Sequence, residues 1–251
     1  MGTSSSSRGS NNSQPLVPSW ADDEPQKPLP APIPDRFRAF RLALGRAVSD
    51  GGDRSDLRKA LGHYARTTTG GSDVGPRRLG NVYSAGGTLY DALQGVASGT
   101  AVPGLDTPEL IGRSTDVFAQ ALGELLAGDT ADADRINRAV QEAVASVLDI
   151  NADFDPALLT DDTIDQLMIE FLSLAVFQNI VEEAGGAWDR APDEEKSAQC
   201  EGELLDLIKV VVESSFERTI GAGTGRFSQD QIKGFMREAA RDAWREWESY
   251  E

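Results

Sequence analysis

The chain has 251 residues, of which 39% are hydrophobic and 26% are charged, as in ordinary globular proteins. Its charge balance is unusual, because 41 acidic residues against 24 basic ones give a net charge of −17. A single cysteine, Cys200, excludes an internal disulfide, and a single histidine, His63, excludes a metal site built from two imidazoles. No apolar run approaches the length of a membrane span. We therefore expect a soluble, cytoplasmic protein that makes no contact with a membrane.

The first 34 residues differ in composition from the rest of the chain. They hold seven of the 12 prolines and seven serines. Proline fixes φ and removes a backbone donor, and apolar side chains are few here, so we expect no helix or strand and no part in the packed core. The composition predicts a disordered Ser/Pro-rich tail that ends in a stiffer stem, Pro25–Pro34. This segment lacks the basic and apolar regions of a secretory signal.

From Arg36 onward, apolar residues recur every three or four positions, which is the spacing of one face of an α-helix. Ile164–Val181 is apolar on nearly every side, so we expect the most buried helix there. Asp53 is placed to cap a helix that follows it. The sequence therefore predicts an all-α, multi-helix bundle. The other predicted helices have apolar faces at Phe37–Val48, Leu57–Tyr64, Leu79–Val96, Ile136–Val147 and Ile232–Trp247.

Basic residues are concentrated in one part of the chain. Residues 36–80 contain ten basic and four acidic side chains, whereas residues 81–251 contain 12 and 33. The basic stripe Arg36–Arg78 is a candidate contact for phosphates of a nucleic acid. The acidic remainder would repel a polyanion, so we favour use of the stripe within the chain or by a protein partner. We divide the chain into a tail at 1–34, a basic Gly-punctuated helical segment at 36–99 and an acidic helical bundle at 107–251.

No pattern in the sequence supplies a catalytic or metal site. Asp149–Asp155 imitates the start of a calcium loop, but Phe154 and Thr160 occupy the positions that need glycine and glutamate. We interpret these aspartates as caps of the next helix and keep a calcium-responsive protein as a third hypothesis. No motif supplies His63 with the nucleophile and the orienting carboxylate that a catalytic histidine needs. The acidic residues near Cys200 would raise the pKa of the Cys200 thiol, which argues against a reactive thiolate. We expect no enzyme, no cofactor and no metal.

The start of the chain carries the most available nucleophile. Met1 is commonly removed before a residue as small as glycine, which exposes the α-amine of Gly2. An α-amine has a pKa of about 7.8, against about 10.4 for lysine, so far more of it is unprotonated near neutral pH. Glycine has no Cβ to obstruct an enzyme, and the small residues that follow suit a strand threaded into a pocket.

Three hypotheses fit this terminus. It is an expression scar or idle tail, or it is N-myristoylated, since Met-Gly-x-x-x-Ser matches with Ser6. The third hypothesis is a different acyl group on Gly2. Trp20, in an otherwise polar tail, is either an anchor for a partner or a side chain that folds back onto the body of the chain.

The order and spacing of short motifs in the first 95 residues are distinctive. Met1–Ser6 is followed by Leu16–Trp20 and a Pro-rich stretch. The other motifs are Asp35–Arg38, Gly45-Arg46, Gly51–Asp53, Leu57, Ala60-Leu61, Tyr64, Gly70-Gly71, Arg77–Gly80 and Ala85-Gly86. Together they resemble the QatB family of bacterial Qat anti-phage defence systems.

The resemblance implies a non-enzymatic component of a four-protein defence operon, with a QueC-like enzyme (QatC-like), an ATPase (QatA-like) and a TatD-like nuclease (QatD-like) as partners. QueC-like enzymes use ATP to activate a carboxy-deazaguanine. The resemblance implies that the enzyme joins this base to Gly2 as an amide. A nucleic-acid-binding helical module is the alternative. The candidate partner-binding residues are Gly2, Thr3, Ser4, Ser5, Ser6, Leu16, Val17, Pro18, Trp20, Arg36, Arg38 and Arg41.

Overall fold

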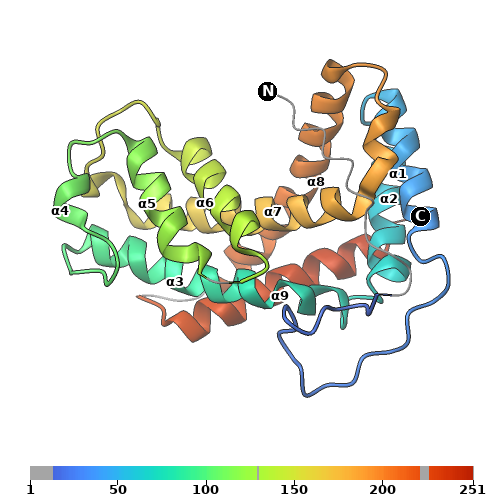
Figure 1. Cartoon of the computed structure of the whole chain (residues 1–251), viewed down its shortest axis with the longest axis horizontal. Coiled ribbons are helices and arrows are strands. Elements are labelled where there is room, and N and C mark those ends of the chain that lie inside the picture. Colours follow the sequence, from blue (N-terminus) through green and yellow to red (C-terminus); the bar gives the residue numbers. More distant parts are fainter. Residues whose placement is uncertain (1–13, 129, 221–225, 251) are drawn as a thin grey trace. The chain divides into compact units, whose positions relative to one another are not determined.

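Figure 1 shows the computed structural model, which describes residues 14–128, 130–220 and 226–250. Within these residues the chain forms nine α-helices and no strand beyond two isolated bridges, which confirms the predicted all-α fold. The α-helices are α1 (Arg38–Asp50), α2 (Arg54–His63), α3 (Gly80–Ala97), α4 (Thr107–Leu110), α5 (Thr115–Ala127), α6 (Ala133–Val147), α7 (Asp161–Ala184), α8 (Glu194–Ile220) and α9 (Gln229–Glu248).

The chain folds into two compact units that draw on separate stretches of the sequence. Helices α7, α8 and α9 contribute residues to both units. The predicted division into residues 1–34, 36–99 and 107–251 stays a prediction. Unit 1 consists of Met1–Leu79, Val176–Val211 and Ala239–Glu251, and unit 2 consists of Gly80–Ala175 and Val212–Glu238.

In unit 1, helix α1 packs against α2 and the 3-10 turn η4 (Gly185–Arg190). Helix α2 begins at the predicted cap, because Asp53 accepts hydrogen bonds from the backbone N–H groups of Ser55 and Asp56. After α2 the chain continues as a π-helical turn, Tyr64–Thr68. The core contains an aromatic cluster in which successive ring centroids lie 5.0, 5.8 and 4.9 Å apart. Its members are Phe40, Tyr64, Trp244 and Trp247.

In unit 2, helix α5 packs against α6 and contacts α3. The rings of Phe118 and Phe154 are stacked with their centroids 3.9 Å apart. Gly86 in α3 lies so close to Met236 of α9 that a Cβ would overlap the methionine sulfur. The helical glycine at this position is therefore explained by a close helix–helix approach.

Helix α7 is largely buried, as its apolar sequence predicted. Within the described part of the chain, one helical stretch, Asp161–Arg190, is long and apolar enough to cross a membrane, judged by length and composition alone. Of its most apolar 18-residue window, 67% is buried inside the protein. This burial is the pattern expected of a core helix.

Gly75→Ala is predicted to destabilise unit 1 by about 2–3 kcal/mol through overpacking. A Cβ at Gly75 would overlap Nε1 of Trp244, a fully buried side chain that donates a hydrogen bond to Thr69 Oγ1 at 2.8 Å. Urea denaturation followed by tryptophan fluorescence measures the loss. Gly202→Ala in α8 is the matched control, because nothing lies within 4 Å of its Cβ position. It should be neutral or stabilising, and equal losses in both variants would contradict the packing argument.

Candidate functional site

Two consecutive arginines, Arg77 and Arg78, make most of the polar contacts that hold residues 15–27 of the N-terminal segment. Arg77 and Arg78 belong to the 3-10 turn η2 (Gly75–Leu79), and each is only 4% exposed. The preceding turn is fixed by Gly70 and Gly71, which have φ values of +86° and +92° that favour glycine. The carbonyl of Gly71 accepts the N–H of Gly75 at 2.7 Å. This local geometry directs two guanidinium groups into unit 1.

Arg77 binds residues 22–27 of the N-terminal segment. Its guanidinium forms a bidentate pair with Asp22, with N–O distances of 2.9 and 2.7 Å, and both side chains are buried. The same guanidinium donates to the carbonyls of Glu24 and Lys27, both at 2.8 Å. Although burial opposes the charge of Asp22, hydrogen bonds from Arg77 hold the pKa of this carboxyl below its usual value. Bidentate, charge-assisted contacts of this kind are the stronger hydrogen bonds of proteins.

Glu24 adds a second attachment of the same segment. Its carboxylate lies 2.6 Å from Lys27 Nζ and 3.2 Å from Arg241 Nη2 of helix α9. The hydrogen bond from Lys27 lowers the pKa of Glu24, and the charge of Arg241 adds to this effect. The segment is thus held by cations from two separate stretches of unit 1.

Arg78 and Arg36 hold the segment further upstream. Arg78 donates to the carbonyl of Leu16 and pairs with Glu183 at 2.5 Å. Burial opposes the charge of Arg78, but Glu183 raises its pKa above the usual value. Arg36 donates to the carbonyl of Pro15 at 3.2 Å. Its Nε and Nη1 atoms are buried and have no hydrogen-bond acceptor among the described residues.

Apolar contacts complete this attachment. Leu16 and Val17 are 4% and 1% exposed and form a small cluster with Val74, against which Leu29 packs. Ala21 is also buried. The expectation that residues 1–34 lie outside the packed core is therefore wrong for these positions. The few apolar residues of the segment do not by themselves offset the entropy of ordering it, and the buried arginines supply stabilisation that the segment's composition does not reveal. We call residues 15–27 together with Arg36, Arg77, Arg78 and Arg241 the N-terminal anchor.

The other predicted site residues have different environments. Gly2, Thr3, Ser4, Ser5 and Ser6 lie outside the described residues. Pro18 accepts a hydrogen bond from the N–H of Ala21, and Trp20 is 51% exposed. Their roles in partner binding stay predictions.

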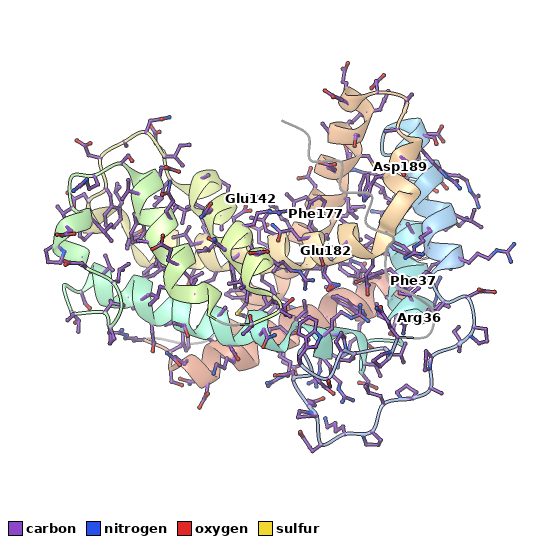
Figure 2. All side chains as sticks on the ribbon, viewed as in Figure 1. Arg36, Phe37, Glu142, Phe177, Glu182 and Asp189 are labelled. Carbon is purple, nitrogen blue, oxygen red and sulfur yellow. The ribbon has the colours of Figure 1, made fainter. Side chains whose placement is uncertain are left out.

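The predicted arginines at the start of α1 also differ from one another. Figure 2 shows Arg36 beside Phe37, and the Arg36 guanidinium lies 4.7 Å from the centre of this ring. Arg41 lies against the same ring at 4.6 Å and donates to the carbonyl of Glu183. Burial lowers the pKa of both arginines. Arg38, in contrast, is exposed.

The basic stripe is therefore divided among several internal contacts. Arg36, Arg77 and Arg78 are buried in the anchor. Arg66 donates to the carbonyls of Glu248 and Tyr250, each at 2.6 Å. Since a phosphate-binding surface needs exposed cations, these contacts weaken the nucleic-acid alternative and agree with use of the stripe inside the chain.

The other residues considered for catalysis or metal binding occupy positions that are typical of residues with a structural role. Cys200 is fully buried, and burial, with a smaller effect of the neighbouring acids, raises its thiol pKa to about 12. Burial, with nearby cations, lowers the pKa of His63. Asp155 caps the 3-10 turn Pro156–Leu158 by accepting the N–H of Ala157, so the interpretation as a cap holds for Asp155, whereas Asp149 accepts the N–H of Asn151 within the loop. Within the described residues, no group of three His, Cys, Asp or Glu side chains is arranged to hold a metal ion.

The fold and the anchor define an all-α protein whose N-terminal segment is fixed to a helical body by buried arginines. Residues 70–247 match the family described as Qat anti-phage system associated protein QatB. The chain therefore belongs to the QatB family, and its membership makes it an anti-phage defence component. Searches of curated proteins and of solved structures found no significant match.

Asp22→Ala is predicted to release the N-terminal segment, because it leaves Arg77 buried without its anionic partner. Chymotrypsin cleavage after Trp20 should become at least tenfold faster, since the next residue, Ala21, is buried in the wild-type protein. Mass spectrometry of timed digests measures the rate. Asp73→Asn, which removes an exposed carboxylate, is the control and should leave the rate unchanged. Equal cleavage of wild type and Asp22→Ala would show that the pair does not hold the segment.

Proposed function

We propose that this chain is a non-enzymatic defence component that presents the α-amine of Gly2 to a QueC-like partner enzyme in the cytoplasm. The enzyme conjugates a carboxy-deazaguanine to that amine. The observation that supports this proposal is the anchor, which fixes residues 15–27 on unit 1 and leaves Gly2 upstream of a defined attachment point. Family membership supports the defence role, and other Qat components, including an ATPase and a TatD-like nuclease, are further proposed partners.

The proposed chemistry needs only a nucleophile from this chain. The unprotonated amine of Gly2 attacks the carboxyl carbon that the partner has activated with ATP, and an amide bond forms. The activating group leaves with the electrons of its bond to that carbon, and the nitrogen loses a proton. The product has no terminal charge and carries a planar base with hydrogen-bonding groups. The helical body contributes by docking the enzyme and by holding residues 15–27, from which the N-terminal residues extend.

The anchor also limits how far the terminus can extend. Twelve residue steps separate Gly2 from Gln14, the residue directly before the anchor, and each step spans at most about 3.6 Å, so Gly2 can reach no farther than about 43 Å from Gln14. An enzyme that modifies Gly2 therefore has to bind with its active site inside this radius. A fixed starting point confines the amine to a smaller volume and raises its effective concentration at a docked enzyme.

Co-expression with the QueC-like partner should produce an adduct on the N-terminal peptide. Intact mass spectrometry and fragmentation of that peptide locate it. Gly2→Pro is expected to abolish the adduct, because a proline ring obstructs the amine that has to attack. Gly9→Pro, which makes the same substitution in the segment upstream of the anchor, should keep it. An unmodified Gly2, or an adduct on lysines alone, would contradict the proposal.

Shortening the chain between Gly2 and the anchor should impair conjugation. Deletion of residues 7–13 leaves five residue steps, or at most about 18 Å, between Gly2 and Gln14. We expect the adduct to fall at least tenfold, as judged by the ratio of modified to unmodified N-terminal peptide. Replacing the same seven residues with seven Gly and Ser residues preserves the length and should preserve conjugation. Full conjugation of the deletion variant would show that the anchor does not set the reach of the terminus.

A further inference from the structure

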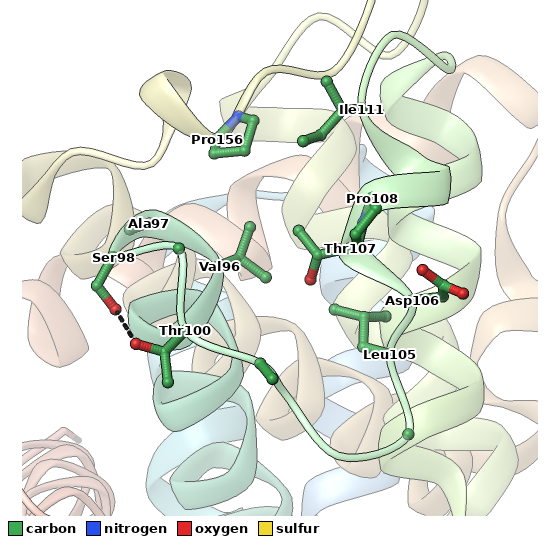
Figure 3. Close-up of a pocket in the computed structure, with 13 residues that line it drawn as sticks. Val96, Ala97, Ser98, Thr100, Leu105, Asp106, Thr107, Pro108, Ile111 and Pro156 are labelled. Atoms are coloured by element: carbon green, nitrogen blue, oxygen red, sulfur yellow. Dashed lines mark hydrogen bonds between the residues drawn. The ribbon is translucent and has the colours of Figure 1, made fainter.

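Unit 2 contains a hollow of about 930 Å³ beside the C-terminal end of α3. Its walls come from the end of α3, the loop at 98–106, the short helix α4 and Pro156 of the 3-10 turn η3 (Pro156–Leu158). Figure 3 shows Val96 and Thr107 pointing toward one another across the hollow, with Ile111 and Pro156 at its rim. A volume of this size is typical of ligand and peptide sites in proteins.

The loop that forms one wall is fixed by its own contacts. The N–H of Thr100 donates to the carbonyl of Gly95 at 2.8 Å, and the N–H of Leu105 donates to the carbonyl of Val102 at 3.1 Å. Val102 packs where Gly95 has no side chain, since a Cβ there would lie 2.6 Å from a Val102 methyl carbon. The hollow is thus formed before any partner binds, which lowers the entropic cost of binding.

The surface of the hollow is mainly apolar. Val96 and Leu105 form a buried floor, and Ile111 at the rim is 54% exposed. Thr107 contributes a buried hydroxyl that has no hydrogen-bond partner among the described residues. A single exposed aliphatic residue is ordinary, but an apolar hollow with exposed Ile111 at its rim and an unsatisfied hydroxyl in its wall indicates a binding surface.

Carboxylates adjoin this apolar surface on the side of Asp106. A second hollow, of about 430 Å³, shares Gly104, Leu105 and Asp106 with the first. Glu109 and Glu124 line the second hollow. Neither hollow has a lysine or arginine among its lining residues in the described part of the chain. We call the two hollows together the acidic groove.

We propose that the acidic groove docks a basic amphipathic segment of a partner protein. Apolar side chains of the segment occupy the hollow between Val96 and Ile111, and its lysines or arginines lie against Asp106, Glu109 and Glu124. Charge complementarity selects this occupant, because a neutral apolar ligand gains nothing from the carboxylates. A second copy of the chain is disfavoured, since each copy carries a net charge of −17. The proposal does not depend on conjugation at Gly2.

The test uses the full chain and a fluorescent synthetic helical peptide with leucines on one face and lysines on the other. Fluorescence anisotropy should show saturable binding, and a peptide of equal composition with scattered leucines should bind at least tenfold more weakly. Ile111→Ser should weaken binding of the amphipathic peptide about tenfold. Val210→Ser is the matched control, because Val210 is a 65% exposed aliphatic residue on α8 in unit 1. It should leave binding unchanged.

The charged rim is tested in the same assay. Asp106→Asn combined with Glu109→Gln should weaken binding and reduce its salt dependence, whereas Glu194→Gln combined with Glu195→Gln at the start of α8 should not. Equal effects of groove and control variants would show general attraction to an acidic protein and overturn the proposal. Self-association of the chain that Ile111→Ser abolishes would also overturn the proposal. So would binding of a neutral apolar dye in the groove, if the amphipathic peptide does not displace the dye. Circular dichroism melting checks that each variant is folded.

Discussion

The buried pair of Arg77 and Asp22 is the interaction on which the organisation of unit 1 most depends. A guanidinium and a carboxylate are costly to remove from water, and the cost is offset only when both are paired and fully hydrogen-bonded. Arg77 meets this condition with Asp22 and two carbonyls of the same segment. Residues 15–27 are therefore part of the folded unit, although their own composition cannot form a core.

The helical part of the fold was predictable because its determinants are local. The apolar spacing located α1, α3, α6, α7 and α9, and Asp53 was correctly identified as a cap. The anchor was not predictable, since it joins residues about 55 positions apart, as in the contact of Asp22 with Arg77. In the sequence, Arg77 and Arg78 count only as charge in a basic stripe. Gly75 and Pro76 beside them are typical of a turn, but no local pattern links that turn to a segment about 55 positions upstream.

The resemblance found in the sequence and the family match overlap only at residues 70–95. The motifs that suggested the QatB family lie in the first 95 residues, whereas the family match spans residues 70–247. The anchor connects these parts, because Arg77, Arg78 and Arg241 lie within the matched region and bind residues upstream of it. The helical body thus positions the terminus on which the proposed chemistry takes place.

A double-mutant cycle on Asp22 and Arg77 tests this account most directly. Asp22→Ala, Arg77→Met and the double variant are compared with wild type by the free energy of unfolding in urea. If the buried pair holds the N-terminal segment on unit 1, the two changes should be coupled by about 2 kcal/mol or more, with the double variant more stable than the sum of the single losses implies. Additive losses, with coupling below about 0.5 kcal/mol, would contradict it.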